Sequence, residues 1–381
     1  MNYLRTAIEL EAPEELPFPI RHNLSESAIS DQTLASLGIT IPPSLCLTYP
    51  PHTGSLPIRA HVASSSGGTL TAEDVLVTSG ASTALFIVMT ALLRKDDHVV
   101  VVRPNYAMNV EVPRAIGCEV TCVDLEFEEG WRVDLGRVGA AVQKGRTKLI
   151  SVCSPNNPTG TVCSGAELRG LAALAKEAGG WLLVDETYSA LVDYDSDASG
   201  VGMAGEMIPP AASLGAHVIG VSSMSKAYGV PGIRIGWLTA TDAALKEKFL
   251  AAKEQICISG SVLDELVAEQ VLAQSKELLA RTAADVRRRR DRVARWVEEE
   301  REWVEWVRPE AGVMCFVRLK RVPEGGAAAF YKTLLERHGV YVGPGRWFEC
   351  EERLFRLGYG WPTWEDLEGG LDAISKALRE G

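Results

Sequence analysis

The sequence predicts an α/β fold, with a large domain built on a mostly parallel sheet and a smaller α+β domain beside it. From Val75 onward, short apolar runs alternate with helical patterns, as in a sheet whose strands are joined by helical crossovers. The apolar runs are continuous, which is expected where helices cover both faces of a parallel sheet. The length of 381 residues favours about two domains.

The large domain is predicted at residues 48–275. Its first strand and the helix after it are expected at 75–80 and 82–95, and a further helix is expected at 165–180. The other strands are expected at 98–106, 118–125, 148–160, 181–191, 217–226 and 233–241. Because ligands of open α/β sheets bind beyond the carboxyl ends of the strands, the residues that follow these strands are the candidates for chemistry.

The smaller domain is predicted from residues 1–47 together with 276–381. Long amphipathic helical patterns occupy 261–301, and a last helix is expected at 364–378. Strands are expected between them at 303–319, 339–344 and 353–360. Helices followed by a run of strands, without strict alternation, are typical of an α+β domain.

Charge and composition argue against several classes of partner. The net charge of -11 disfavours nucleic acid and anionic membrane surfaces, since both require a positive binding face. The basic run at 287–290 is followed by acidic residues in the same helical pattern, and we interpret it as a solvated helix face. The N-terminus lacks the pattern of a signal peptide, and no apolar run reaches the ~18 residues of a membrane span.

The cysteines indicate a reducing compartment. The chain has eight of them, scattered through apolar stretches. Cys118 and Cys122 are spaced like a ligand pair, but they lie in a strand pattern with no second pair nearby, so no metal site is predicted. We expect reduced, buried thiols and a cytoplasmic protein.

The turn TSGAS, residues 78–82, ends a strand and opens a helix. After Gly80, the backbone amides of Ala81 and Ser82 would point at whatever binds there, and the N-termini of helices attract phosphate. Many strand-to-helix turns of this composition bind nothing, so the turn by itself is a weak signal.

Two further strand ends carry polar side chains. In SPNNPTG the amide of Asn157 would project over the end of the sheet as a hydrogen-bond donor, or the segment is simply a turn. In VDETYSAL an apolar strand leads directly into Asp185 and then Tyr188. A carboxylate that emerges from a buried strand is costly to leave unpaired, so we expect Asp185 to have a cationic partner or to cap a helix.

The stretch SMSKAYGVPGIRIGW, residues 223–237, places a lysine and an arginine around a glycine-rich turn. At the end of a buried strand, desolvation and neighbouring cations would lower the pKa of Lys226 and make its amine a candidate nucleophile. The fixed fork of donors of Arg234 suits a phosphate. Either residue alone would be a weak signal.

Together, the four strand ends provide what one cofactor requires. Pyridoxal phosphate (PLP) needs a lysine for its aldehyde, a carboxylate for its pyridinium nitrogen, donors for its phenolic oxygen and a cradle for its phosphate. The combination therefore predicts a PLP enzyme with a small-molecule substrate.

These motifs resemble those of the class I and II aminotransferases, the aspartate aminotransferase superfamily of PLP fold type I, over nearly all of the chain. The resemblance implies that Lys226 forms the aldimine with the cofactor and that Asp185 pairs with the pyridinium nitrogen. It implies that Asn157 and Tyr188 bind the phenolic oxygen. The phosphate-binding positions of the family match Gly80, Ala81, Ser82, Ser223 and Arg234.

The resemblance implies further contacts and a homodimer. Tyr106 in RPNYAM matches the aromatic residue that stacks on the cofactor ring. Tyr49 in YPPHTG matches a tyrosine that family members lend to the phosphate of the neighbouring subunit. Arg356 in RLFRLGYG resembles the arginine that binds the substrate α-carboxylate, where a bidentate guanidinium fixes the plane of the carboxylate and a lysine does not.

A segment near the N-terminus departs from the family pattern. Family members usually have a glycine-containing segment that closes over the substrate, whereas here Glu26 lies between two serines in HNLSESAIS. Glu26 is either a solvated loop charge or the partner of a cationic substrate side chain, as in arginine or an arginine derivative. His52, near Tyr49, either faces the site or is simply exposed.

Three functions are compatible with these residues. The first is an aminotransferase that moves an amino group from an L-amino acid, as a hypothesis a basic one, to a 2-oxo acid. The second is elimination or cyclisation at the β or γ carbon, because the segments around Glu26 and Lys226 also resemble, more faintly, capreomycidine synthase, a PLP enzyme that dehydrates and cyclises a hydroxyarginine. The third is a regulatory cofactor-binding protein, which the presence of Lys226 and Arg356 disfavours.

Overall fold

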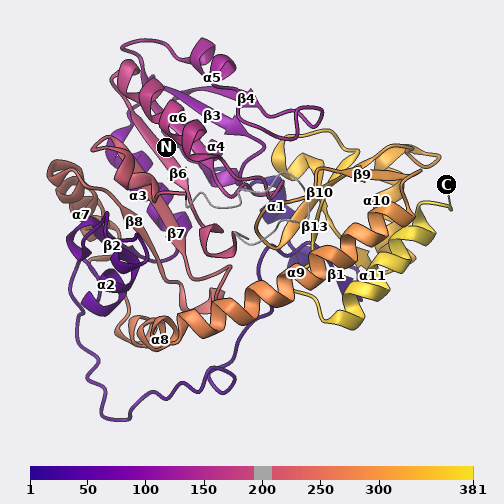
Figure 1. Cartoon of the computed structure of the whole chain (residues 1–381), viewed down its shortest axis with the longest axis horizontal. Helices are drawn as coiled ribbons and strands as arrows, with labels where there is room; N and C mark the ends of the chain where they lie inside the picture. The colour runs from indigo at the N-terminus through magenta and orange to yellow at the C-terminus, as the bar shows by residue number, and fades with distance from the viewer. Residues whose placement is uncertain (193–207, 381) are drawn as a thin grey trace.

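The computed structural model describes residues 1–192 and 208–380. Its centre is a seven-stranded sheet in the order β2–β8–β7–β6–β5–β3–β4 (Figure 1). The strands of this sheet are β2 (Val75–Thr78), β3 (His98–Arg103), β4 (Glu119–Asp124), β5 (Thr147–Cys153), β6 (Trp181–Asp185), β7 (Val218–Ser223) and β8 (Gly236–Thr239). All neighbouring pairs are parallel except those that β8 makes with β2 and β7. The predicted mostly parallel sheet is therefore confirmed.

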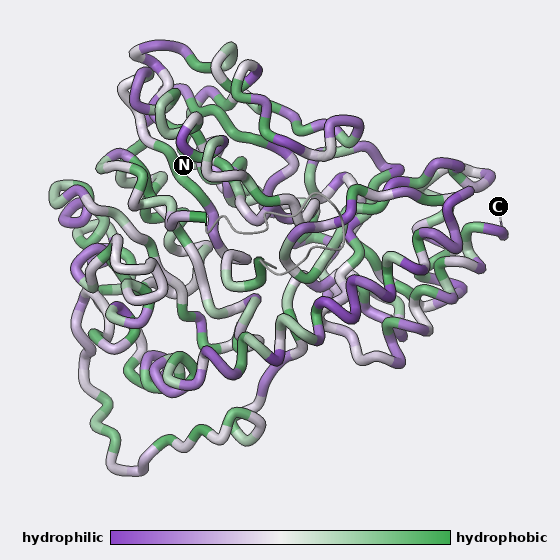
Figure 2. Tube along the Cα trace, viewed as in Figure 1, coloured by the Kyte–Doolittle hydropathy of each residue, from purple (hydrophilic) through white to green (hydrophobic). Residues whose placement is uncertain are grey.

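Helices cover both faces of this sheet, and Figure 2 shows hydrophobic strands between them. In β3, Val99 and Val101 pack into one core, and Val100 and Val102 pack into the other. Burial on both sides is the physical reason for the continuous apolar runs in the sequence. The helices of this part are α2 (Leu56–Ser64), α3 (Ala81–Leu92), α4 (Ala107–Ile116), α5 (Leu135–Ala141), α6 (Gly165–Ala178), α7 (Ala243–Cys257) and α8 (Val262–Ala273).

A second, antiparallel sheet lies beside the first and has the order β12–β13–β10–β9 (Figure 1). Its strands are β9 (Val304–Trp306), β10 (Met314–Leu319), β12 (Gly343–Pro344) and β13 (Leu354–Gly358). The helices of this part are α10 (Gly326–Glu336) and α11 (Trp364–Ala377), and the long helix α9 (Ser275–Glu299) reaches it from the large sheet. The α+β character expected for the C-terminal part is present.

The N-terminal segment attaches to this second part. The short strand β1 (His22–Asn23) pairs in parallel with β11 (Val340–Tyr341). Short helical turns complete the described fold, namely α1 (Ala7–Leu10), η1 (Pro13–Glu15), η2 (Ala72–Asp74), η3 (Ser189–Leu191), η5 (Ala211–Leu214), η6 (Pro231–Ile233) and η7 (Gly345–Phe348). The domain boundaries after residues 47 and 275 stay a prediction.

The basic run at 287–290 is a solvated helix face only in part: Arg288 is exposed, but the interpretation from the sequence is wrong for the last two arginines. Arg289 and Arg290 of α9 are buried, with exposed fractions of 5% and 6%. Nη1 of Arg289 donates hydrogen bonds to the backbone oxygens of Tyr359 and Pro362 at 3.1 and 2.7 Å. This guanidinium therefore fastens α9 to the loop that follows β13.

The thiols are only partly as expected. All eight cysteines are free, and Cys153, Cys163 and Cys315 are buried. Cys46 is exposed, so the expectation of a buried thiol is wrong there, and the other four cysteines are partly buried. Among the described residues, no His, Cys, Asp and Glu side chains gather in threes or more to hold a metal ion. In the described part of the chain, no helix is both long and apolar enough to cross a membrane.

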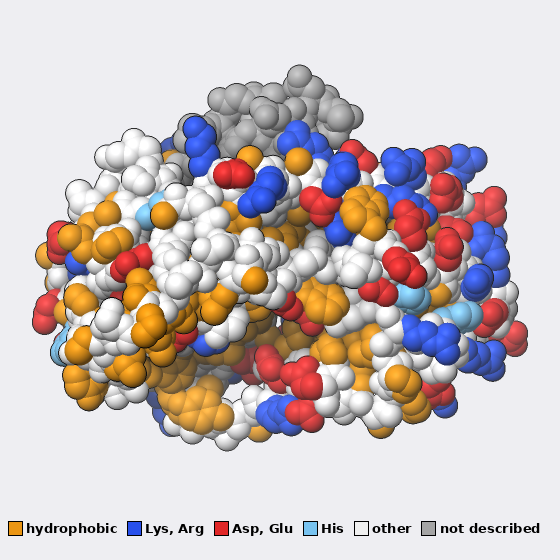
Figure 3. All heavy atoms as spheres, turned by 90° about the horizontal axis from the view of Figure 1, so that it is seen from below, with side chains coloured by type: hydrophobic (Ala, Val, Ile, Leu, Met, Phe, Trp, Pro, Cys, Tyr) orange, Lys and Arg blue, Asp and Glu red, His pale blue; other side chains and the backbone are white. Residues whose placement is uncertain are grey.

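The segment before α2 extends outward from the body of the subunit, below the large sheet in the view of Figure 1. Seen from below, in Figure 3, hydrophobic side chains gather on this side of the molecule. Tyr49 and Leu47 are 78% and 73% exposed. Other large apolar side chains with exposed surface are Leu34, Ile41, Leu56, Ile256, Ile258 and Leu263. Single exposed apolar residues are ordinary, but a group of them indicates a surface that another molecule covers.

Glu186 follows Asp185 at the end of β6 but faces a different cavity, which lies between the sheet and the start of α9. Its Oε1 accepts a hydrogen bond from the backbone N–H of Ala211 at 2.9 Å. Burial raises the pKa of Glu186 to about 7, and the charge of Asp185 acts in the same direction. The folded protein therefore favours the protonated form of this carboxyl group.

Replacing Glu186 with Gln should stabilise the protein at alkaline pH. The folded pKa of Glu186 lies above its unfolded value, so its contribution to stability is complete below about pH 4.5 and is lost as the pH rises through about 7. We expect the variant to gain about 1–3 kcal/mol over the wild type above pH 8 and to lose that advantage towards acid pH. Denaturant unfolding of both proteins across this range measures the difference, and a difference independent of pH would contradict the assignment.

Candidate active site

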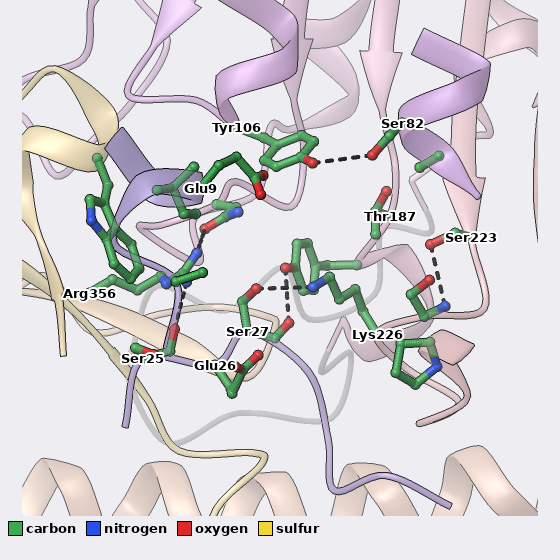
Figure 4. A pocket seen from close by; sticks show the side chains of 18 of the residues that line it. Glu9, Ser25, Glu26, Ser27, Ser82, Tyr106, Thr187, Ser223, Lys226 and Arg356 are labelled. Carbon is green, nitrogen blue, oxygen red and sulfur yellow. Dashed lines mark hydrogen bonds between the residues drawn. The ribbon is translucent and has the colours of Figure 1, made fainter. Parts of the chain in front are cut away.

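A pocket of about 330 Å³ opens where β5, β6 and β7 end, bounded also by α3, α4, β13 and the N-terminal segment (Figure 4). Parallel strands bring their carboxyl ends to one edge of a sheet, so residues distant in sequence meet there. The predicted residues that line the pocket are Glu26, Ala81, Ser82, Tyr106, Asn157, Asp185, Tyr188, Ser223, Lys226, Arg234 and Arg356. The structure therefore brings most of the predicted site together.

The N-terminus of α3 and Arg234 form a cradle for an anion. Gly80 immediately precedes the helix with φ of 84°. A Cβ atom on Gly80 would lie 2.4 Å from Nη2 of Arg234, so only glycine permits this approach. Nη1 of Arg234 donates to the backbone oxygen of Pro231 at 2.8 Å, which holds the guanidinium in place. The free amides at the start of the 12-residue helix and this guanidinium together suit a phosphate.

Lys226 follows β7, and its Nζ donates a hydrogen bond to Oγ of Ser27 at 3.2 Å. Burial, together with the positive charge of Arg356, lowers the pKa of Lys226 to about 8. The ammonium form is disfavoured because the amine has little access to water and has a cation nearby. The sequence prediction of a depressed lysine pKa thus agrees with this geometry.

Asp185 is buried at the end of β6 among neutral donors. Its Oδ1 accepts hydrogen bonds from the backbone N–H and Oγ1 of Thr187 at 3.1 and 2.6 Å. Its Oδ2 accepts one from Nδ2 of Asn109 at 3.4 Å. Burial raises the pKa of Asp185. Neutral donors fix this carboxylate in position, and a cationic ring nitrogen in the pocket would supply the charge that a buried carboxylate favours.

Arg356 on β13 is 4% exposed and lies between two aromatic rings. The centre of its guanidinium is 5.5 Å from the ring of Trp347 and 5.4 Å from that of Phe348. Nη1 donates to Oδ1 of Asn157 at 3.1 Å, and Nη2 donates to the backbone oxygen of Ser25 at 2.5 Å. Nε is buried without a hydrogen-bond partner. A buried donor left unpaired points to a ligand oxygen, and a carboxylate fits a guanidinium edge.

Two aromatic hydroxyls complete the described pocket. The Tyr106 hydroxyl is 3.1 Å from Oγ of Ser82, so the ring at the start of α4 is tied to the start of α3. The Tyr188 hydroxyl donates to the backbone oxygen of Ser27 at 3.0 Å. Burial raises the pKa of both tyrosines, so both hydroxyls keep their protons at neutral pH.

The segment around Glu26 is pressed against β13. The backbone N–H of Gly358 donates to the oxygen of Leu24 at 2.7 Å. A Cβ atom on Gly358 would lie 1.8 Å from the backbone oxygen of Glu26, so a larger residue would push the segment away. Glu26 lines the pocket, and its negative charge favours the protonated forms of Lys226 and Arg356. The carboxylate of Glu26 therefore lies in the pocket, near Lys226 and Arg356, and is not only a solvated loop charge.

Tyr49 and His52 do not line the pocket of their own subunit. Nδ1 of His52 is 2.6 Å from Oε1 of Glu254, on the outer side of α7. The alternative that His52 faces the site of its own subunit is therefore wrong. A role for Tyr49 requires a second subunit.

The pocket includes a stretch that the sequence analysis did not identify. Ile8, Glu9, Ala12, Pro13 and Glu14 line its mouth, 200 or more residues before Lys226 in the chain. The acidic sequence ELEAPEEL has neither a strong period nor a motif, so only its position in the fold reveals it.

These groups fit PLP. The cradle made by Gly80 and Arg234 suits a phosphate, and the amine of Lys226 suits an aldehyde. The buried carboxylate of Asp185 suits a protonated ring nitrogen, and the unpaired Nε of Arg356 remains for a substrate carboxylate. Tyr106 offers a flat ring in the same pocket.

Comparisons with known proteins agree with this arrangement. The sequence profile of the family "Aminotransferase class I and II" matches residues 44–374. Capreomycidine synthase of Streptomyces vinaceus is 30% identical over 304 residues, 80% of this chain and 74% of that enzyme. Arginine–pyruvate transaminase of Pseudomonas aeruginosa is 32% identical over 286 residues, 74% of this chain and 69% of that enzyme.

Solved structures give the same result. A PLP-dependent aminotransferase from Streptococcus suis has a TM-score of 0.88 at 29% identity, with 100% of this chain and 98% of that chain covered. The family profile spans most of the sequence, and the pocket holds side chains suited to PLP. The chain therefore belongs to the class I and II aminotransferases, which depend on PLP.

Proposed function

We propose that this aminotransferase takes its amino group from an amino acid with a cationic side chain and passes it to a 2-oxo acid. The observation that carries the proposal is Glu26, a carboxylate in the pocket wall close enough to act on both Lys226 and Arg356. A neutral or acidic substrate side chain gains nothing from a carboxylate there, whereas a guanidinium or ammonium group pairs with it. The relative from Pseudomonas aeruginosa is by its name an enzyme of arginine.

The other pocket residues have roles that follow from their positions. Nε of Arg356 is available to the substrate α-carboxylate, which would orient the substrate in the pocket. PLP, when bound, carries the amino group and accepts electron density from the substrate Cα. Lys226 Nζ, with a pKa of about 8, can hold or release a proton near neutral pH and is the proposed base at Cα.

The remaining residues are proposed to hold the cofactor. Asp185 would pair with its ring nitrogen, and Tyr106 would lie against its ring. Asn157 and Tyr188 would bind its phenolic oxygen, since Asn157 uses only its oxygen for Arg356. The phosphate would lie against Gly80, Ala81, Ser82, Ser223 and Arg234.

A second candidate function uses the same pocket. Similarity to capreomycidine synthase favours a lyase or cyclase that acts at the β or γ carbon of an arginine derivative. The two functions differ in their need for an acceptor, because elimination or cyclisation regenerates the starting enzyme without a 2-oxo acid.

Arginine and citrulline provide a direct test of the substrate class. They have nearly the same shape, but citrulline carries a neutral ureido group in place of the guanidinium. We expect the PLP-loaded enzyme, without a 2-oxo acid, to form one equivalent of keto acid from arginine and to react at least about tenfold less efficiently with citrulline. Equal reaction with both would contradict a cationic substrate. Because arginine has no leaving group at its β carbon, the lyase or cyclase is tested with 3-hydroxyarginine, whose repeated turnover without a 2-oxo acid, with loss of water, would support it.

The role of Glu26 is tested by replacing it with Gln. The change removes the charge and keeps the size, so the preference for arginine over citrulline should fall about tenfold, with citrulline little affected. The exposed Glu247 of α7 provides a matched control, because its replacement with Gln alters the net charge equally, far from the pocket. An equal loss with both substrates would show that Glu26 maintains the pocket without recognising charge.

The amine of Lys226 should be unusually reactive for a lysine. Because only the neutral amine attacks, its acylation in the cofactor-free protein should be half-maximal near pH 8. Peptide mapping by mass spectrometry after brief acylation from about pH 6 to about pH 10 gives the profile, and bound PLP should protect the residue. A rate that still climbs steeply at pH 10 would contradict the lowered pKa.

We also propose a cytoplasmic homodimer in which Tyr49 binds the cofactor phosphate of the neighbouring subunit. The exposed apolar side chains around Tyr49 and α2 support an interface, and the eight free cysteines support the location. An outward segment with a 78% exposed tyrosine has no evident purpose within one subunit.

Mixed dimers test this arrangement. One subunit would carry Lys226→Ala and the other Tyr49→Phe, with different affinity tags for purification. If Tyr49 acts across the interface, the site that keeps Lys226 receives an intact Tyr49 and binds PLP as tightly as the wild type. If it acts within its own subunit, that site should bind PLP as weakly as the Tyr49→Phe homodimer, and a monomer in solution would contradict the proposal altogether.

A further inference from the structure

The N-terminal segment places a second carboxylate, that of Glu9, at the mouth of the pocket (Figure 4). In Figure 4, Glu9 extends towards the ring of Tyr106, while Glu26 lies on the other side of the guanidinium of Arg356. Burial raises the pKa of Tyr106, and the negative charge of Glu9 adds to this effect, which agrees with their proximity. The two acidic residues therefore approach the pocket from different segments and directions.

The segment that carries Glu9 is fixed to the wall of the pocket by Glu11. Its two carboxylate oxygens accept hydrogen bonds from Nε and Nη2 of Arg346, both at 2.8 Å. Nε1 of Trp347 donates to the same carboxylate at 2.8 Å, and the hydroxyl of Tyr341 donates to the backbone oxygen of Glu11 at 2.6 Å. We refer to these four residues as the Glu11 latch. A bidentate pair with an added indole donor is strong and directional.

The Glu11 latch connects the segment to the residue that binds the substrate α-carboxylate in the proposed function. Trp347 donates to Glu11 through its indole nitrogen, and its ring lies 5.5 Å from the guanidinium centre of Arg356. Trp347 of η7 therefore contacts both the guanidinium of Arg356 on β13 and the segment that carries Glu9.

The carboxylate of Glu9 is free to bind a ligand. Within the described parts of the chain, Glu9 forms hydrogen bonds through its backbone only: its N–H donates to the oxygen of Thr6 at 3.1 Å, and its oxygen accepts from Nη2 of Arg5 at 2.9 Å. The neighbouring Glu15 differs, because its carboxylate pairs with Arg5 at 2.7 Å and does not line the pocket. Glu9 thus faces the pocket as a solvent-exposed carboxylate that has no ion pair among the described residues.

The charges in the pocket indicate what Glu9 binds. The neutral amine of Lys226 suits an aldehyde, and the cations Arg234 and Arg356 find partners in a phosphate and an α-carboxylate. No part of PLP or of an amino-acid backbone then pairs with Glu26 or with the mouth carboxylates Glu9 and Glu14. A planar guanidinium presents donors along more than one edge and can bind two carboxylates at once, whereas an ammonium is a compact point charge.

We propose that Glu9 is a second specificity-determining residue. Glu9 binds one edge of the substrate guanidinium, and Glu26 binds a different edge of the same group. The Glu11 latch positions the segment that carries Glu9. The inference rests on the proposed function, because it concerns the same substrate. It adds that the enzyme prefers a substrate with a guanidinium group to one with an ammonium group. It also assigns part of the recognition of the substrate side chain to the N-terminal segment, outside the two main sheets.

The first test is a double-mutant cycle of Glu9→Gln and Glu26→Gln in the PLP-loaded enzyme. Glu9→Gln should lower the preference for arginine over citrulline about tenfold and the preference for arginine over lysine several-fold. The double variant should lose less than the product of the single losses if both side chains hold one group. Glu15→Gln, on the same segment, should leave both preferences unchanged.

The second test follows the segment itself and does not require turnover. Arginine should slow hydrogen–deuterium exchange of residues 5–15 in the wild type, and citrulline should slow it much less. Glu11→Gln, which weakens the latch, should raise exchange of this segment and lower the preference for arginine towards that of Glu9→Gln.

The outcomes separate this inference from the proposed function. If the wild type does not distinguish arginine from citrulline, the proposed substrate class fails, and the inference about Glu9 fails with it. If the wild type does distinguish them but Glu9→Gln keeps both preferences and the exchange pattern, only the inference about Glu9 is overturned. Equal losses for all substrates would also overturn it, because they would show a general structural role.

Discussion

The site depends on the pairing of three adjacent parallel strands, β5, β6 and β7. Hydrogen bonds set Cys153 opposite Asp185 and Asp185 opposite Val221, so the three strands reach the same edge of the sheet almost in step. The loops that leave this edge carry Asn157, the Thr187 cap of Asp185, and Lys226. Asn157, Asp185 and Lys226 lie close together because the register of these strands brings their ends to one place. A slip of one residue in β6 would turn Asp185 to the opposite face of the sheet.

Burial then sets the electrostatics of the pocket. It lowers the pKa of Lys226 and of Arg356 and raises that of Asp185, so the charged forms of these three residues are less favourable there than in water. The fold supports this arrangement with hydrogen bonds to neutral groups, such as Thr187 for Asp185. Ligand charges restore the balance, which is why a doubly charged cofactor and a zwitterionic substrate suit the pocket. Part of the free energy of ligand binding therefore comes from pairing buried groups, such as Nε of Arg356, that have no partner in the folded chain alone.

Much of this was predictable from the sequence, because strands and the polar residues just after them follow simple patterns. Asp185 and Lys226 each end an apolar run, and the sheet brings them together as predicted. The contribution of Glu9 was not predictable, since its short helix has neither a clear period nor a motif, and tertiary packing alone places it at the pocket. Arg289 was interpreted wrongly for a related reason: a charged helical pattern does not reveal which guanidinium finds backbone oxygens inside the protein. The short helix α2 was left out because its polar and apolar faces contrast only weakly and give little signal.

The reversed strand β8 has a consequence for the spacing of the site. Because β8 runs antiparallel to β7, it begins at the edge where its neighbours end, and Gly236 lies opposite both Thr78 and Ser223. Arg234 is thus delivered by the start of a strand, and the chain between it and Lys226 spans a single hairpin-like connection through η6. The length of that connection sets the separation between the two ends of the cofactor. An inserted or deleted residue in this connection would change the distance between Lys226 and Arg234. The site would then no longer match the length of the cofactor, even if every functional side chain were retained.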